Sequence, residues 1–209
     1  CRIAQVEDGY WIAYAKYSST GENHLFVLKT NPDGRTMIPP FLLATVTRAD
    51  DSASYYRFAL IPREGGGIQV LTTEKDGDST SRPAILHDYV LDRQGKIIRS
   101  EPVMKERTSY SQQFKTMWAA RTADGRTVFA AFSSDGALWW GVYRDSSNAQ
   151  SWEAASSADY FATHYDTALD RLYIMYSNYY SSAADSTCMT RWTLDLSLIH
   201  ISEPTRLRR

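Results

Sequence analysis

Long apolar runs, an excess of charge of either sign and clusters of cysteine or histidine are all missing from this sequence. No apolar stretch approaches the ~20 residues that a membrane-spanning helix needs, so we expect no membrane insertion. The net charge of −1 gives no field that would attract nucleic acid. The two cysteines, Cys1 and Cys188, allow at most one disulfide and match no zinc spacing. Cys1 fits a lipidated first residue or an ordinary strand residue, and we favour the second.

Recognisable catalytic and cofactor motifs are also missing. The sequence has no G-x-S-x-G, no phosphate-binding loop and no dinucleotide-binding glycine pattern. Its histidines show no Cys/His or His/Asp spacing that suggests a metal site. We therefore expect no cofactor and no metal, and an enzyme is the less favoured class. An active site built from scattered loop residues would leave no motif, so that alternative stays open.

Strand and turn signals dominate what is present. The clearest stretch is 118–152, in which an apolar strand, the Asp124-Gly125 turn and a second strand are followed by another turn and the aromatic strand 137–143. This order predicts a meander of antiparallel strands. Trp139 and Trp140 are adjacent in that last strand, so they should point to opposite faces and pack between neighbouring sheets.

The same unit recurs along the chain. The glycines that close successive first turns, Gly9, Gly67 and Gly125, lie 58 residues apart, and a fourth turn follows about 45 residues later. A repeat of this length with four strands is typical of a β-propeller blade. We predict an all-β fold, a β-propeller fragment of about four four-stranded antiparallel blades with the last incomplete, over roughly 1–46, 55–104, 114–155 and 159–195. A β-sandwich is the structural alternative.

The final residues form a separate segment. Leu196 to Arg206 reads LSLIHISEPTR, which closely resembles the translated adapter of a sequencing library, as found at the end of a metagenomic DNA fragment. We expect 196–209 to be non-native and to take no part in fold or function. The natural protein should then continue beyond about residue 195, and the missing Met at the start indicates truncation there as well.

The repeat also predicts where a binding surface lies. Connections between the second and third strands of each blade, and between blades, are long and share one face, which we call the long-loop face. The other connections are tight turns and define the tight-turn face. Loops on a rigid scaffold are where binding usually resides. The expected ligand-binding residues on the long-loop face are Asp50, Asp51, Asp76, Asp78, Arg82, Arg107, Tyr110, Tyr179 and Tyr180.

Two of these groups have a specific chemistry. Asp76 and Asp78 could supply carboxylate oxygens to calcium, but the other spaced ligands of an EF-hand loop are absent, so a hydrated loop is favoured. Tyr179 and Tyr180 could form a stacking surface for sugar rings. We therefore expect a glycan or a protein as the ligand.

Two segments resemble the Asp-box of sialidases, Ser-x-Asp-x-Gly-x-Thr-Trp, at the turn between the third and fourth strands. Asp145 to Trp152 (DSSNAQSW) keeps the final Ser-Trp, and Thr30 to Met37 (TNPDGRTM) keeps the Gly and Thr. Arg2-Ile3 resembles the Arg-Ile-Pro start of that family. The resemblance implies a propeller layout and a site with an arginine triad, a Tyr/Glu pair and an acidic Asp. Arg57 and Arg121, on expected inner strands, would be the arginines that face the axis.

The sequence thus leaves three functional readings. The preferred one is a binding or interaction module of an exported bacterial protein, at the cell surface, in the periplasm or outside the cell. The second is a sialidase-like glycan hydrolase, and the third is a purely structural propeller. Convergence of arginines and carboxylates in the central funnel would discriminate the second from the first.

Overall fold

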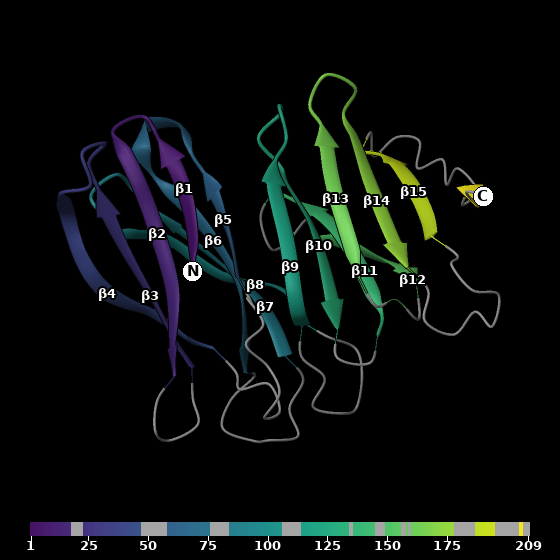
Figure 1. The fold of residues 1–209 in the computed structure, drawn as a ribbon, viewed down its shortest axis with the longest axis horizontal. Helices are drawn as coiled ribbons and strands as arrows, with labels where there is room; N and C mark the ends of the chain where they lie inside the picture. The colour runs from purple at the N-terminus through teal and green to yellow at the C-terminus, as the bar shows by residue number, and fades with distance from the viewer. Residues whose placement is uncertain are drawn as a thin grey trace.

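The computed structural model describes sixteen strands and one short 3-10 turn, almost all antiparallel and arranged in four successive units. The described residues are 1–17, 23–46, 58–75, 84–105, 114–133, 136–144, 149–155, 158, 160–177, 187–194 and 205–206. In Figure 1 the units fan out from the first strands on the left to the last on the right.

Each unit is a blade of four strands. The first blade contains β1 (Arg2–Val6), β2 (Gly9–Tyr17), β3 (Asn23–Thr30) and β4 (Thr36–Val46). The second contains β5 (Phe58–Pro62), the 3-10 turn η1 (Glu64–Gly66), β6 (Ile68–Lys75), β7 (Ala84–Leu91) and β8 (Ile97–Lys105). The third contains β9 (Phe114–Arg121), β10 (Thr127–Ser133), β11 (Leu138–Tyr143) and β12 (Gln150–Ala155). The fourth contains β13 (Phe161–Asp166), β14 (Arg171–Ser177), β15 (Thr187–Thr193) and β16 (Thr205–Arg206).

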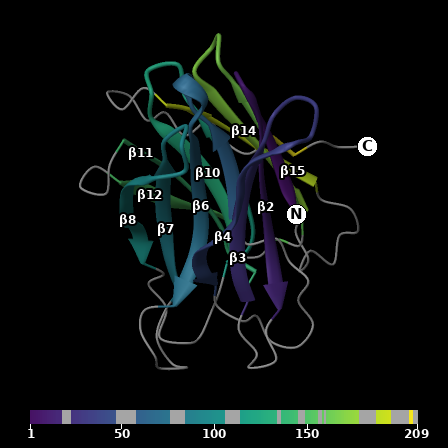
Figure 2. The ribbon, with the colours of Figure 1, turned by 90° about the vertical axis from the view of Figure 1, so that its left-hand side faces the viewer.

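Within each blade the strands pair in chain order. One cross-strand pair, Val46 with Glu74, also links β4 to β6, so the first two blades share one eight-stranded sheet. Figure 2 shows this continuity, with β2 to β4 running into β6, β7 and β8. The inner strands β1, β5 and β9 lie next to one another. The all-β, propeller-type fold of four blades is therefore confirmed.

The hydrophobic core consists of the interfaces between blades. Strand β2 buries Trp11 and Ala13 against the second blade, whereas Ile12 and Tyr14 on its other face are only half-buried. The second strands of inner blades have neighbours on both sides, so β6 is buried at every position from Ile68 to Thr73. A strand that is covered on both faces has buried residues at every position. Its sequence therefore lacks the apolar–polar alternation of a strand in a surface sheet.

The prediction for the two adjacent tryptophans is confirmed. Trp140 is buried in the cluster between the third and fourth blades, where its ring centroid lies 4.7 Å from that of Trp192. Trp139 packs on the opposite side, against the cluster between the second and third blades. Their opposite directions follow from the two-residue period of a strand.

The tail is part of the sheet in one place. We expected residues 196–209 to take no part in the fold; within them, Thr205 and Arg206 form β16 and pair with Met189 and Cys188 of β15. The outer edge of β15 presents backbone N–H and C=O groups that an extended segment can pair with, whatever its origin. Among the described residues, no helix is long and apolar enough to cross a membrane.

Candidate ligand pocket on the blade axis

The four inner strands line a partly open pocket of about 390 Å³, which we call the axial pocket. Its lining residues come from β1, β5, β9 and β13 and are Arg2, Ile3, Ala59, Leu60, Thr116, Met117, Trp118, Ala119, Phe161, Ala162 and Thr163. Most of them lie near the beginnings of their strands, so the pocket is displaced toward the long-loop face. Its volume falls within the range of small-molecule binding sites.

Most of the lining side chains are apolar or aromatic, but more of the pocket surface is polar than apolar. Trp118 and Phe161, both half-buried, contribute ring surface, and the hydroxyls of Thr116 and Thr163 contribute hydrogen-bonding capacity. Arg2 is the one charged residue among those that line the pocket in the described part of the chain. A pocket of this kind can position a ligand through ring stacking and a small number of hydrogen bonds.

The pocket does not contain the catalytic set that a sialidase-like enzyme would need. No aspartate or glutamate is among its lining residues in the described ranges, and glycosidases of the common types use a pair of carboxyl groups. Of the arginines expected at the axis, Arg57 lies outside the described residues. Arg121 ends β9 at the tight-turn face and is not among the residues that line the pocket.

The residues predicted to bind a ligand on the long-loop face cannot be compared with the pocket. Asp50, Asp51, Asp76, Asp78, Arg82, Arg107, Tyr110, Tyr179 and Tyr180 all lie outside the described residues. The Asp-box-like segment 145–152 is described only from residue 149. The other such segment, 30–37, forms the predicted turn, in which the Gly34 N–H donates to Asn31 O at 3.0 Å and Gly34 has a φ of 81°.

The three described histidines lie on different strands. The structure places His24 on β3, His87 on β7 and His164 on β13. Their ring contacts are local ones, such as the 3.0 Å hydrogen bond between His87 Nε2 and Ser100 Oγ. Within the described residues no group of three or more His, Cys, Asp or Glu side chains has the geometry to hold a metal ion.

Sequence reasoning missed a series of buried polar groups that join the blades near the tight-turn face. Between the first two blades, the fully buried Lys29 donates to Asp8 Oδ2 at 2.9 Å, to Gly66 O at 3.0 Å and to Arg93 O at 3.2 Å. Trp11 Nε1 also donates to Gly66 O, at 3.0 Å. A lysine within the apolar strand HLFVLKT was the signal available in the sequence.

A second network joins the second and third blades. Gln69 Nε2 donates to Asp88 Oδ1 at 3.0 Å, to Thr127 Oγ1 at 2.9 Å and to Tyr143 OH at 3.2 Å. Arg99, whose side chain is partly exposed, forms an ion pair with the buried carboxylate of Asp88. Gln69 and the three residues to which it donates are all buried. Polar groups in a core need such partners, because an unsatisfied buried group costs about 1–3 kcal/mol.

A third set of contacts joins the last two blades. Arg126 Nη1 donates to Leu194 O at 2.6 Å, and its Nη2 lies 3.2 Å from Asp170 Oδ2. Tyr165 OH donates to the other oxygen of Asp170 at 2.6 Å. Asp124 Oδ2 forms an ion pair with the same guanidinium, 2.6 Å from Nε. Each blade interface therefore combines an apolar cluster with one polar set.

The electrostatic environment differs among these aspartates. Burial raises the pKa of Asp8, but hydrogen bonds from Lys29 and Arg93 together with their charges outweigh it, so the net pKa lies below its usual value. For Asp88 the balance is reversed. Its complete burial raises the pKa, and the opposing effects of Arg99 and Gln69 offset this only in part.

Comparisons with known proteins leave the family open. No protein-family model matches this chain, and no curated protein matches it. Among solved structures, it is similar to the crystal structure of endo-arabinase from Bacteroides thetaiotaomicron VPI-5482, with a TM-score of 0.44 and 10% sequence identity over 97% of this chain and 77% of that one. Similarity of this degree establishes neither a shared family nor a shared activity.

Proposed function

We propose that this chain is a binding module whose axial pocket accepts a carbohydrate. The observation that supports the proposal is the composition of the pocket, where Trp118 and Phe161 lie with the hydroxyls of Thr116 and Thr163 in a cavity of about 390 Å³. Sugar rings present C–H faces that stack on aromatic rings and hydroxyls that hydrogen-bond to protein side chains. Arg2 would favour a sugar with a carboxylate or another acidic substituent.

The long-loop residues predicted from the sequence fit the same proposal. The pocket is displaced toward the face on which the tyrosines at 179 and 180 and the acidic loop residues were expected. A glycan longer than one or two sugars would extend from the pocket toward those loops. A protein ligand on the same loops is the alternative occupant, and a secreted, surface or periplasmic location would suit either.

Glycan hydrolysis is a weaker alternative for this chain. It would need a general acid and a second carboxylate on either side of the scissile bond, and the described lining contains neither. Aspartates from the long loops would have to supply both. The assay that separates the two readings is release of reducing ends from oligosaccharides that the full chain binds, for which the proposal expects none.

A test of binding starts with the full-length chain on an array of neutral and acidic oligosaccharides. Positive ligands are then titrated against three variants by calorimetry. Ala162→Trp should abolish binding, because an exposed alanine of the lining is replaced by an indole that occupies the cavity. Arg2→Gln should weaken acidic ligands by about tenfold, the equivalent of one charge-assisted hydrogen bond, and leave neutral ligands unchanged.

The matched control is Thr167→Trp, an exposed turn residue on the opposite face. It adds the same indole without approaching the pocket, so binding should be unaffected. Equal affinity of wild type and Ala162→Trp would refute the axial pocket as the binding site.

A further inference from the structure

The tight-turn end of the interface between the second and third blades holds two arginines, one at the end of each of the packed strands β5 and β9. Arg63 follows β5 directly and has an extended backbone, with φ −121° and ψ 149°. The alternation of the strand therefore continues, and Arg63 points to the same side as Ala59, which packs against the third blade. Arg121 ends β9 and shares the side of Met117, which packs against the second blade in the same cluster.

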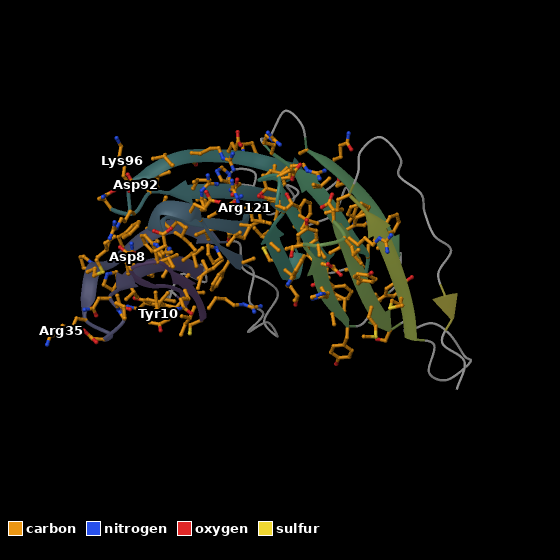
Figure 3. The ribbon with its side chains drawn as sticks, turned by 90° about the horizontal axis from the view of Figure 1, so that it is seen from above. Asp8, Tyr10, Arg35, Asp92, Lys96 and Arg121 are labelled. Atoms are coloured by element: carbon orange, nitrogen blue, oxygen red, sulfur yellow. The ribbon has the colours of Figure 1, made fainter. Side chains whose placement is uncertain are left out.

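Figure 3 looks onto the tight-turn face and shows how Arg121 lies. It is in the interior of the arc, between the strands of the second and third blades, far from the outer turn that holds Asp92 and Lys96. Gly125 leaves space for its guanidinium, since a Cβ there would lie 3.1 Å from Arg121 Nη2. Arg63 and Arg121 are both half-buried.

Neither guanidinium is neutralised within the described part of the chain. Arg63 and Arg121 make no side-chain hydrogen bond or ion pair with another described residue, whereas three nearby carboxylates are paired with other arginines. Asp88 and Glu101 pair with Arg99. Asp124 pairs with Arg126 and Arg144. Arg63 and Arg121 therefore have no ion-pair partner among the described residues, although the charges of Asp88 and Glu64 act on Arg63 from a distance.

The two charges act on each other. Burial, and then the positive charges of Arg121 and Arg99, lower the pKa of the Arg63 guanidinium from its usual value. Asp88 and Glu64 oppose this shift and do not cancel it. Half-buried like charges at the ends of two packed strands repel each other, and an anion placed between them would remove that repulsion.

We propose that Arg63 and Arg121 bind a doubly charged tetrahedral oxyanion, a sulfate or a phosphate, at the tight-turn end of this interface. Two unpaired guanidinium groups match the charge of a dianion, and each planar fork can donate two parallel hydrogen bonds to its oxygens. The anion is either free or an ester group on a larger molecule. The site is on the face opposite the axial pocket and does not depend on the carbohydrate proposal.

The first measurement is thermal unfolding of the full chain in sodium sulfate, in sodium phosphate and in sodium chloride of equal ionic strength. We expect a saturable rise of the unfolding midpoint with the dianions and only a small, non-saturable change with chloride, because a ligand of the native state stabilises it in proportion to occupancy. A sulfated and a phosphorylated monosaccharide, compared with the free anions, distinguish an ester group from an inorganic ion. Tighter binding of the ester would assign the site to a larger molecule.

Two variants and a control then locate the site. Arg63→Gln and Arg121→Gln should each weaken binding of the dianion by about tenfold or more. Arg121→Lys should weaken it by less, because lysine keeps the charge but lacks the two parallel N–H donors of the guanidinium. Arg35→Gln, an exposed arginine of a tight turn, should bind like wild type. Without dianion, the midpoint of Arg121→Gln should equal or exceed that of wild type, since repulsion is relieved. Equal stabilisation by sulfate and chloride, or unchanged binding in both glutamine variants, would overturn the proposal.

Discussion

The ammonium group of Lys29 lies 2.9 Å from Asp8 Oδ2, and the same nitrogen donates to backbone oxygens of the second blade. Lys29 is fully buried, and its Nζ is 5.4 Å from the ring centroid of Trp11. One buried cation therefore holds the β1–β2 turn, η1 and the β7–β8 turn together.

Replacement of this cation should destabilise the interface between the first two blades. Lys29→Met keeps the length of the side chain but removes one donor from each of Asp8, Gly66 O and Arg93 O and the charge that partners Asp8, so we expect a loss of about 3 kcal/mol in the free energy of unfolding. Urea denaturation would measure it. The control is Lys16→Met on β2, an exposed position where the change should stay within about 0.5 kcal/mol. Equal stability of the two variants would contradict this role.

The lowered pKa of Asp8 predicts a dependence of stability on acid pH. Its folded pKa is below the unfolded value of about 4, so the folded state favours the ionised form. The contribution of Asp8 is complete above the unfolded pKa and is lost as the pH falls through the folded pKa. Asp8→Asn should therefore flatten the curve of unfolding free energy between about pH 5 and pH 2. If the slope of unfolding free energy against pH is unchanged in the variant, carboxylates other than Asp8 control the loss of stability at acid pH.

Removal of Gln69 should uncouple the second and third blades. Gln69→Leu fits the volume but leaves Asp88, Thr127 and Tyr143 short of a partner, with an expected cost of about 1–3 kcal/mol. Tyr143→Phe removes one acceptor and should cost about 1 kcal/mol. A double-mutant cycle between these positions, measured by chemical denaturation, should give a coupling energy of at least about 0.5 kcal/mol. If the two substitutions have additive effects on the free energy of unfolding, Gln69 and Tyr143 do not belong to the same network.

The indole pair at the last interface should hold the fourth blade in place. Trp192→Ala removes a buried ring that contacts Trp140 and should cost about 3–5 kcal/mol. Limited proteolysis should then cut the fourth blade before the first three. Tyr160→Ala, at a position 80% exposed, provides the control and should not alter the cleavage pattern. Uniform cleavage along the chain in Trp192→Ala would contradict separate detachment of this blade.

Deletion of the tail tests whether the last strand matters. The pairing of β16 with β15 involves only two residues, so a chain that ends at residue 195 should lose less than about 1 kcal/mol of stability. Thermal unfolding of both chains would measure the difference. A large fall in the midpoint would show that the tail, despite its resemblance to an adapter, contributes to the fold.

The sequence by itself determined the local features of this protein. Turn residues such as Asn31 to Gly34 and the apolar runs between them depend on short-range preferences, so strand positions, their antiparallel order and the four blades could be predicted. The opposite directions of Trp139 and Trp140 followed from the strand period alone. The resemblance of the tail to an adapter was visible in its letters, but its short pairing with β15 depends on the free edge that the fold presents.

Tertiary structure alone decided which side chains meet across blades. Gln69 and Thr127 are separated by the repeat length, and nothing in either strand shows that their side chains face one another across an interface. The direction of Arg121 depends on the extent of β9 and the place of its turn, and the axial pocket needs one segment from each of four inner strands. Contacts of this kind depend on the packing of blades about a common axis, which the periodicity of a single strand does not encode.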